Sequence, residues 1–177
     1  MPRIEVNEHC FLSEFQTDDQ PAIVEHLQEK AIYDRTLRIP YPYTPADAAK
    51  WTEIVAETTR QHGEPTQFAI RGGDGGCIGA IGFDDLHKGH RAEIGYWLAK
   101  PWWGRGLMTD VVAAACRYAV DRWQLVRIYA YVFDFNAASA RVLLKNGFEH
   151  EGRLRRQIHK DGKFLDADVF ALVTARG

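Results

Sequence analysis

The chain has 177 residues, 46 % of them hydrophobic and 26 % charged, which is typical of one folded domain and not of a disordered or fibrous chain. Its longest apolar run, residues 111–116, is far shorter than the roughly 20 residues of a membrane span, and the first residues lack a signal-peptide core. Three scattered cysteines, Cys10, Cys77 and Cys116, predict reduced thiols in a cytoplasmic protein.

The formal net charge of −2 hides an uneven distribution. Residues 1–90 carry 8 basic and 15 acidic side chains, whereas residues 91–177 carry 14 and 9. A mildly acidic chain argues against general nucleic-acid binding. The basic second half is compatible with one polyanionic ligand, and equally with chance scatter of surface charge.

The first half predicts short strands around two helices. Residues 10–15 are expected to form a strand, and Thr17 with Gln20 predicts a capping box for a helix over 18–31. Thr44 and Pro45 then begin a helix that ends near Gly63. Strands are predicted at 68–71 and 77–83, and the glycine-rich segment between them is typical of a hairpin turn.

The second half predicts alternating strands and helices. A strand at 91–98 precedes a long amphipathic helix that Gly106 opens, and a further strand spans 125–132. A helix over 136–146 ends at Gly147, and 148–160 with 164–173 form a last hairpin. The order βααβββαβαββ predicts a mixed α/β fold in one domain, residues 1–177.

The segment from Trp103 to Thr109 has the composition of a phosphate-binding loop. It leads from a predicted strand into a helix, whose first backbone N–H groups and dipole attract anions, and its glycines permit close approach. Two glycines separated by one residue are weak evidence alone, and a plain helix start is the alternative. The third Rossmann glycine and the Walker Gly-Lys-Ser/Thr are both missing.

Four motifs in order make the pattern specific. They are E-x-G-Y-W-L over 93–98, W-G-x-G over 103–106, N-x-x-S over 136–139 and N-G-F over 146–148. Together they resemble the GCN5-related N-acetyltransferase (GNAT) superfamily, and most closely its RimJ/RimL type, which acetylates ribosomal-protein N-termini. The resemblance covers nearly the whole chain. It implies the GNAT fold, acetyl-coenzyme A as cofactor, and direct attack of an acceptor amine on the acetyl thioester.

The resemblance also assigns cofactor contacts. It implies that the Leu98 amide bonds the thioester carbonyl or the pantetheine arm, where a donor would stabilise the oxyanion. Asn136 would contact the pantetheine, although a helix cap is the alternative. Lys145 would reach the adenosine 3′-phosphate, with ordinary surface charge as the alternative. The pyrophosphate would lie on the loop residues Gly104, Arg105, Gly106, Leu107, Met108 and Thr109, of which Met108 departs from the small residue of the family pattern.

Two residues are the predicted catalytic groups. Glu93 is a carboxylate on a central strand, which is uncommon, and the resemblance supports a general base there. An ion pair with Arg91, Arg127 or another neighbour is the alternative. Ser139 is the predicted proton donor to the leaving thiolate, because Leu143 stands where many family members carry a tyrosine acid, and a small solvent-side residue is the alternative. No metal is expected, since the histidines and cysteines lack zinc spacing.

The acceptor is expected to bind beside a proline-rich aromatic loop. Tyr33, Arg38, Tyr41 and Tyr43 would contact a cationic amine, and packing of the tyrosines is the alternative. A protein N-terminus is favoured. A small-molecule amine (polyamine, aminosugar, amino acid or antibiotic), a bulkier acyl donor, or a non-catalytic acyl-CoA-binding domain remain open. Neither nucleic acid nor membrane is an expected partner, and the last hairpin offers an edge for a homodimer.

Overall fold

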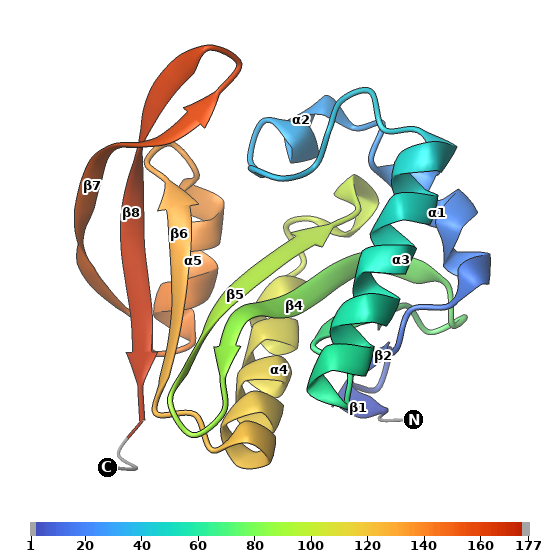
Figure 1. Ribbon diagram of the computed structural model, residues 1–177, viewed down its shortest axis with the longest axis horizontal. Helices are drawn as coiled ribbons and strands as arrows, with labels where there is room; N and C mark the ends of the chain where they lie inside the picture. Colours follow the sequence, from blue (N-terminus) through green and yellow to red (C-terminus); the bar gives the residue numbers. More distant parts are fainter. Residues whose placement is uncertain (1–2, 175–177) are drawn as a thin grey trace.

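A computed structural model describes residues 3–174 and contains one mixed β-sheet (Figure 1). Within this range eight strands lie in the order β1-β2-β3-β4-β5-β6-β8-β7. Strands β5 and β6 run parallel, and the remaining neighbours run antiparallel. The bounds are β1 Ile4–Asn7, β2 Cys10–Ser13, β3 Gln67–Arg71, β4 Cys77–His87, β5 Arg91–Leu98, β6 Arg127–Phe133, β7 Glu149–Lys160 and β8 Lys163–Val173.

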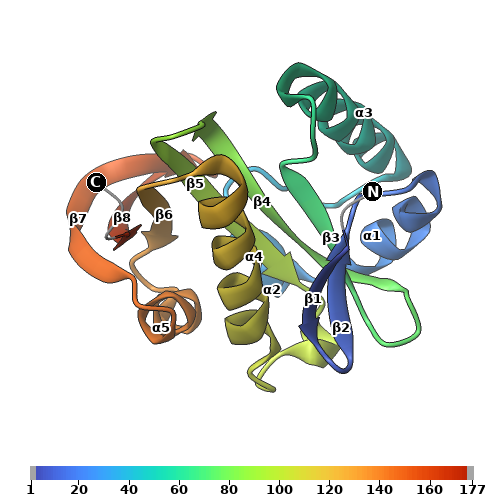
Figure 2. The ribbon, with the colours of Figure 1, turned by 90° about the horizontal axis from the view of Figure 1, so that it is seen from below.

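Helices cover both faces of the sheet, as the view in Figure 2 shows. One face carries α1 (Gln20–His26), α2 (Lys30–Tyr33) and α3 (Pro45–His62), whereas α4 (Leu107–Trp123) and α5 (Ala137–Lys145) lie on the other. Two short 3₁₀ turns, Thr17–Asp19 and Lys100–Trp102, precede α1 and α4. The α4 side holds the larger core cluster, and the α1–α3 side holds a second cluster that includes Ile23 and Tyr43.

The predicted mixed α/β fold is confirmed, with one strand added at its start. The expected order lacks β1, a strand of only four residues that pairs with β2. Its two polar residues, Glu5 and Asn7, leave a hydrophobic pattern too short to predict a strand from sequence. Strand β4 also continues past Phe83 to His87, through a register shift after Asp84.

The helix predicted over 18–31 is wrong in its continuity and in its cap. The residue that caps the first turn is Gln16 and not Thr17. The backbone N–H of Gln16 donates a hydrogen bond to the Asp19 carboxylate at 2.8 Å. The chain then leaves the helix after His26, and Glu29 caps a separate helix by accepting from the Ala31 N–H. The apolar spacing suggested one helix because Ile23, Leu27 and Ile32 all enter the same core cluster.

Candidate active site

The sheet opens at β5, and this opening defines the candidate site. Strands β5 and β6 pair at only three positions, and Glu93 opposite Tyr129 is the last of them. From Ile94 onward, no strand of the described residues lies on that edge of β5. An unpaired strand edge presents N–H and C=O groups that another extended chain can bind.

The register shows which amides face this gap. Leu98 lies opposite Gly79, and the Ala99 N–H donates to the Ile78 carbonyl at 2.8 Å. In an antiparallel ladder this pattern makes Leu98 a non-hydrogen-bonded position with respect to β4, so its N–H points toward the gap. The Leu98 carbonyl accepts from Trp103 Nε1 at 2.6 Å, which holds the following loop against the end of the strand.

The loop after β5 ends in an exposed helix N-terminus. Gly104 and Gly106 have φ of +74° and +78°, and no atom lies within 4 Å of where their Cβ atoms would be. Both residues therefore have backbone conformations that favour glycine, and both border open space. Thr109 and Asp110 donate to the Gly106 carbonyl at 2.9 and 3.4 Å, so the amides before Thr109 are the ones that the helix does not use.

The cations near this loop have different surroundings. The Arg105 guanidinium lies 5.6 Å from the Trp102 ring centre and is exposed. Lys100 instead donates to Glu29 at 3.0 Å, which ties it to the α1–α3 layer. Lys145 is exposed at the last turn of α5, where the helix dipole favours a cation whether or not a phosphate binds. Its role toward the 3′-phosphate stays a prediction.

The first turn of α5 meets β5 through two side chains. The Asn136 side chain caps the helix by accepting from the Ser139 N–H at 3.3 Å. The Ser139 hydroxyl lies 2.8 Å from the Tyr96 hydroxyl. Burial raises the pKa of Tyr96 to about 12, so this phenol is protonated at neutral pH. Tyr96 is not among the predicted site residues, although the E-x-G-Y-W-L motif contains it.

Glu93 lies on the opposite face of β5, toward α1–α3. Its side chain is 23 % exposed, and its Oε1 lies 3.8 Å from Arg38 Nη2. Burial raises the pKa of Glu93, and Asp84 and Asp85 raise it further against the opposing effect of Arg38. A carboxyl group with a raised pKa is a better proton acceptor, so this environment suits a general base.

The expected ion-pair partners of Glu93 lie elsewhere. Arg91 pairs with Asp85 at 3.1 Å and Arg127 with Glu151 at 2.6 Å. The ion pair of Glu93 is therefore formed with another neighbour, Arg38, and not with Arg91 or Arg127. Sequence spacing does not indicate this contact, because Arg38 comes from a loop more than 50 residues earlier.

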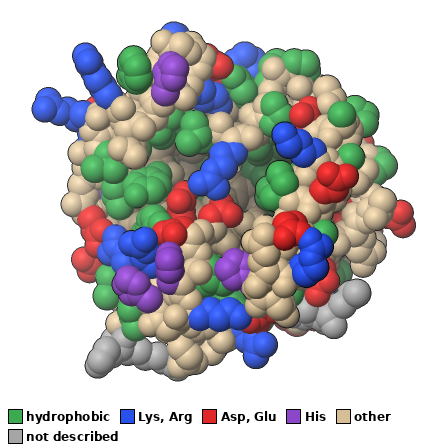
Figure 3. Space-filling view, in the orientation of Figure 1, with side chains coloured by type: hydrophobic (Ala, Val, Ile, Leu, Met, Phe, Trp, Pro, Cys, Tyr) green, Lys and Arg blue, Asp and Glu red, His purple; other side chains and the backbone are tan. Residues whose placement is uncertain are grey.

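A chain of polar contacts holds Arg38 in place. Its Nη1 donates to Asp84 at 2.6 Å, and Asp84 accepts from Gln67 Nε2 at 2.9 Å. A Cβ at Gly82 would collide with the Gln67 amide, so the small residue on β4 makes room for it. Figure 3 shows this face of the molecule with a central hollow, where acidic side chains lie close to a basic one.

The tyrosines of the predicted acceptor loop have three different environments. Tyr33 donates to Asp161 in the β7–β8 turn, and Lys160 lies 3.7 Å from its ring centre. Tyr41 is 44 % exposed, with its ring centre 5.4 Å from that of Tyr33. Tyr43 is only 6 % exposed within the second core cluster. Its buried ring favours the packing interpretation over acceptor contact.

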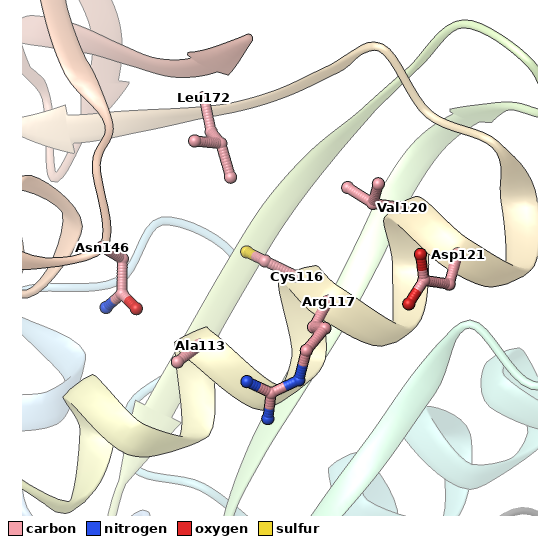
Figure 4. Close-up of a pocket in the computed structure, with 7 residues that line it drawn as sticks. All are labelled: Ala113, Cys116, Arg117, Val120, Asp121, Asn146 and Leu172. Carbon is pink, nitrogen blue, oxygen red and sulfur yellow. The ribbon is translucent and has the colours of Figure 1, made fainter. Parts of the chain in front are cut away.

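A separate hollow of about 290 Å³ lies along the C-terminal half of α4 (Figure 4). It contains none of the predicted site residues. Its lining is Ala113, Cys116, Arg117, Val120, Asp121, Asn146 and Leu172. Burial raises the pKa of Cys116 to about 12, which keeps this thiol protonated and supports a role as core filler.

Residues 3–174 contain neither a candidate metal-binding cluster nor a helix that could span a membrane. No group of three or more His, Cys, Asp or Glu side chains is arranged to hold a metal ion. No helix there is long and apolar enough to cross a membrane. The three cysteines are free and buried.

The comparison with protein families decides the assignment. Residues 9–149 match the family described as "Acetyltransferase (GNAT) domain". The chain belongs to the GNAT acetyltransferase family. The expected GNAT fold is thereby confirmed, and the glycine loop, the open edge of β5 and Glu93 all fall within the matched residues.

Two curated relatives match about half of this chain. The chain is 41 % identical over 100 residues to "Uncharacterized N-acetyltransferase YoaA" of Bacillus subtilis, covering 56 % of each chain. It is 33 % identical over 99 residues to "[Ribosomal protein uS5]-alanine N-acetyltransferase" of Escherichia coli, covering 55 % of this chain and 51 % of the other. The matches thus span about half the length of these curated relatives.

Solved structures share the fold. RimL, a ribosomal L7/L12 alpha-N-protein acetyltransferase in complex with coenzyme A, aligns with a TM-score of 0.88 over 99 % of this chain and 100 % of that chain, at 22 % identity. The ribosomal-protein-S5-alanine acetyltransferase of Vibrio fischeri aligns at 0.86 over 99 % and 98 %, at 19 % identity. At these identities the likeness concerns the fold alone.

Proposed function

We propose that the protein transfers an acetyl group from acetyl-coenzyme A to an acceptor amine. The observation that carries the proposal is the opening of the sheet after Glu93, which leads along the free edge of β5 to the glycine loop at the start of α4. Acetyl-coenzyme A bound in this gap would have its pyrophosphate at the helix N-terminus and its acetyl end near the middle of β5.

The residues of the loop side would bind and orient the cofactor. The amides between Gly104 and Met108 suit the pyrophosphate, with Arg105 as the exposed cation beside them. The Leu98 N–H suits the thioester carbonyl, where a donor would stabilise the oxyanion of the tetrahedral intermediate. Asn136 caps the first turn of α5 by accepting from the Ser139 N–H. This cap holds Ser139 where α5 borders the gap.

The reaction would use the two faces of β5 for two different tasks. Glu93 would accept a proton from the acceptor amine, directly or through water, so that nitrogen attacks the acetyl carbon. When the C–S bond breaks, the electron pair stays on sulfur, and Ser139 would donate to the leaving thiolate. No covalent enzyme intermediate is needed.

A protein or peptide N-terminus is the acceptor class that we favour. The acceptor side carries Asp84, Asp85 and Glu93, which suit an alkylammonium group. The relative from Escherichia coli that is named for alanine of ribosomal protein uS5 supports this class. The loop of residues 33–44 contacts the β7–β8 turn through Tyr33, so these two segments would border the path of an incoming peptide end.

A free amino acid is the second candidate. Arg38 is 65 % exposed in its side chain, and a guanidinium suits the carboxylate of an amino acid whose ammonium faces Glu93. A relative named "L-amino acid N-acetyltransferase AaaT", from Escherichia coli, is 28 % identical over 162 residues, covering 89 % of this chain and 94 % of the other.

Release of free thiol from acetyl-coenzyme A tests the proposal and separates these acceptors. The chain would be incubated with a library of N-terminal peptides and, in parallel, with amino acids, polyamines and aminosugars. We expect amine-dependent thiol release, strongest with peptides that have a free N-terminus. N-terminally blocked peptides are the matched control. Binding of coenzyme A without thiol release for any amine would contradict the enzymatic function and favour a non-catalytic acyl-CoA-binding domain.

Compartment and assembly are also proposals. Three free buried cysteines support a reducing compartment such as the cytoplasm. The long outer strand β7 is largely exposed and pairs with β8 on one side, which supports a homodimer through this edge.

A further inference from the structure

We propose that Tyr96 is a positioning residue for the reaction: its hydroxyl donates to Ser139 Oγ, which directs the serine proton toward the leaving sulfur. The proposal rests on the proposed acetyl transfer and adds a residue to it. It starts from the 2.8 Å contact between the two hydroxyl oxygens, one on β5 and the other on α5.

The surroundings of Tyr96 favour the phenol as the donor of this pair. The Tyr96 side chain packs against the core cluster beneath α4, and its other acceptor, the Ser139 carbonyl, is at the long distance of 3.5 Å. A phenol is a stronger acid than an aliphatic alcohol, so it is the better donor in a bond between the two. With Tyr96 donating, the Ser139 hydrogen is free to turn toward another acceptor.

The two contacts of Ser139 together fix its hydroxyl. Its backbone N–H donates to the Asn136 side chain at 3.3 Å, which sets the main chain at this position. The bond to Tyr96 then restricts the rotation of the side chain. A serine hydroxyl without such a partner samples several rotamers, and a donor that is already oriented loses less entropy in the transition state.

The chemical step balances without ionisation of the tyrosine. As the C–S bond breaks, the electron pair stays on sulfur, and Ser139 donates a hydrogen bond to the developing thiolate while keeping its proton, because a thiol is a far stronger acid than serine. The Tyr96 O–H, which donates to Oγ, polarises the serine hydroxyl and strengthens that bond. The departing thiolate takes its proton from solvent. Tyr96 keeps its own proton throughout, in agreement with its buried environment.

A double-mutant cycle tests this role. Tyr96→Phe removes one oxygen and keeps the packed ring, and we expect it to lower kcat by up to about tenfold, the size of one lost neutral hydrogen bond, with KM for acetyl-coenzyme A unchanged. Ser139→Ala should lower kcat by a similar factor or more. Because Tyr96 acts through Ser139, the double variant should be no slower than Ser139→Ala alone.

Tyr118→Phe is the matched control, since it makes the same change in a half-buried tyrosine of α4 that packs against Phe68 and Trp123 away from the loop. It should leave kcat unchanged. Multiplying effects in the double variant, or unchanged kcat in Tyr96→Phe, would overturn the role of Tyr96. Neither result touches the proposed function, which fails only if the unaltered chain transfers no acetyl group.

A second variant keeps the proposal testable if Tyr96→Phe does not fold. Fluorinated tyrosine at position 96 retains the hydroxyl and makes it a stronger donor. We expect kcat equal to or above that of the unaltered chain at neutral pH. A kcat that falls severalfold while the fluorinated chain keeps its unfolding midpoint would overturn the proposal.

Discussion

The two faces of β5 differ in what they offer a ligand. Toward α4 and α5, the site consists mainly of main-chain groups: the free edge of the strand, two glycines with positive φ and a helix N-terminus. Toward α1–α3, it consists of charged side chains gathered from three segments, with Arg38 between Asp84 and Glu93. The first face suits a cofactor that many proteins share, and the second suits an acceptor that differs between proteins.

This difference also explains what the sequence predicts. Glycines before a helix and a cap residue such as Asn136 are local features, so the motif order alone names the residues of the loop side, and their contacts with the cofactor stay a prediction. The neighbours of Glu93 depend on contacts between distant segments. Gln67, Asp84 and Arg38 form one polar chain in the structure, yet no spacing in the sequence connects them.

Local sequence patterns also predict most elements of the fold. Long periodic segments such as α3, α4 and β5 begin and end close to the predicted residues. The errors concern short elements whose form depends on packing, namely β1 and the break between α1 and α2. Tyr43 was predicted to contact the acceptor because its neighbours are aromatic, but tertiary packing buries its ring.

The largest expected effect concerns the stability of the α1–α3 layer. Arg71 of β3 and Asp19 before α1 form an ion pair with side chains 8 % and 6 % exposed. Asp19→Ala would leave a buried guanidinium without its partner and should lower the free energy of unfolding by about 3–5 kcal/mol. Chemical denaturation measures this loss.

Asp18→Ala is the matched control, because it removes the same side chain at an exposed neighbouring position. Its unfolding free energy should change by less than about 0.5 kcal/mol. Equal changes in the free energy of unfolding for the two substitutions would show that the α1–α3 layer does not depend on this buried pair.

The next effect concerns catalysis. Glu93→Gln should lower turnover by roughly 10²–10³-fold, as expected for a lost general base, with little change in coenzyme A affinity. The base must be deprotonated to act, so the rate should rise with pH through the pKa of Glu93, which burial raises. The variant should lack this acidic limb of the pH–rate profile.

Glu64→Gln provides a control at a carboxylate that is 14 % exposed and pairs with Lys88 and Arg122 away from the gap. It should keep both turnover and the acidic limb. Survival of that limb in Glu93→Gln would assign the base to another group or to water.

A smaller effect is expected from the acceptor loop. Tyr41→Ala removes an exposed aromatic ring and should raise the acceptor KM about two- to fivefold, the size of an exposed cation–π contact, with unchanged affinity for coenzyme A. Steady-state kinetics with the best peptide acceptor measures it. Tyr43→Ala is the contrast, since loss of its buried ring should lower stability first. An unchanged acceptor KM in Tyr41→Ala would remove Tyr41 from the acceptor site.

The smallest effect concerns the electrostatics around Glu93. Arg38 lowers the pKa of Glu93, so Arg38→Ala should raise that pKa and move the acidic limb to higher pH. The rate on that limb should fall by at most about fivefold, because the guanidinium is well exposed. Lys50→Ala, on the exposed surface of α3, should not move the limb. A shift to lower pH would contradict the charge balance described for Glu93.

Calorimetric titration of Gly106→Val tests whether coenzyme A binds where the glycine loop opens α4. Valine is strained at φ +78° and would fill the open space at the loop. Gly63→Val is the matched control, because Gly63 has φ +73° and equally open surroundings at the end of α3. We predict that Gly63→Val binds coenzyme A like the unaltered chain, whereas Gly106→Val remains folded and loses measurable binding. Unchanged coenzyme A affinity in folded Gly106→Val would show that the pyrophosphate does not bind at this loop.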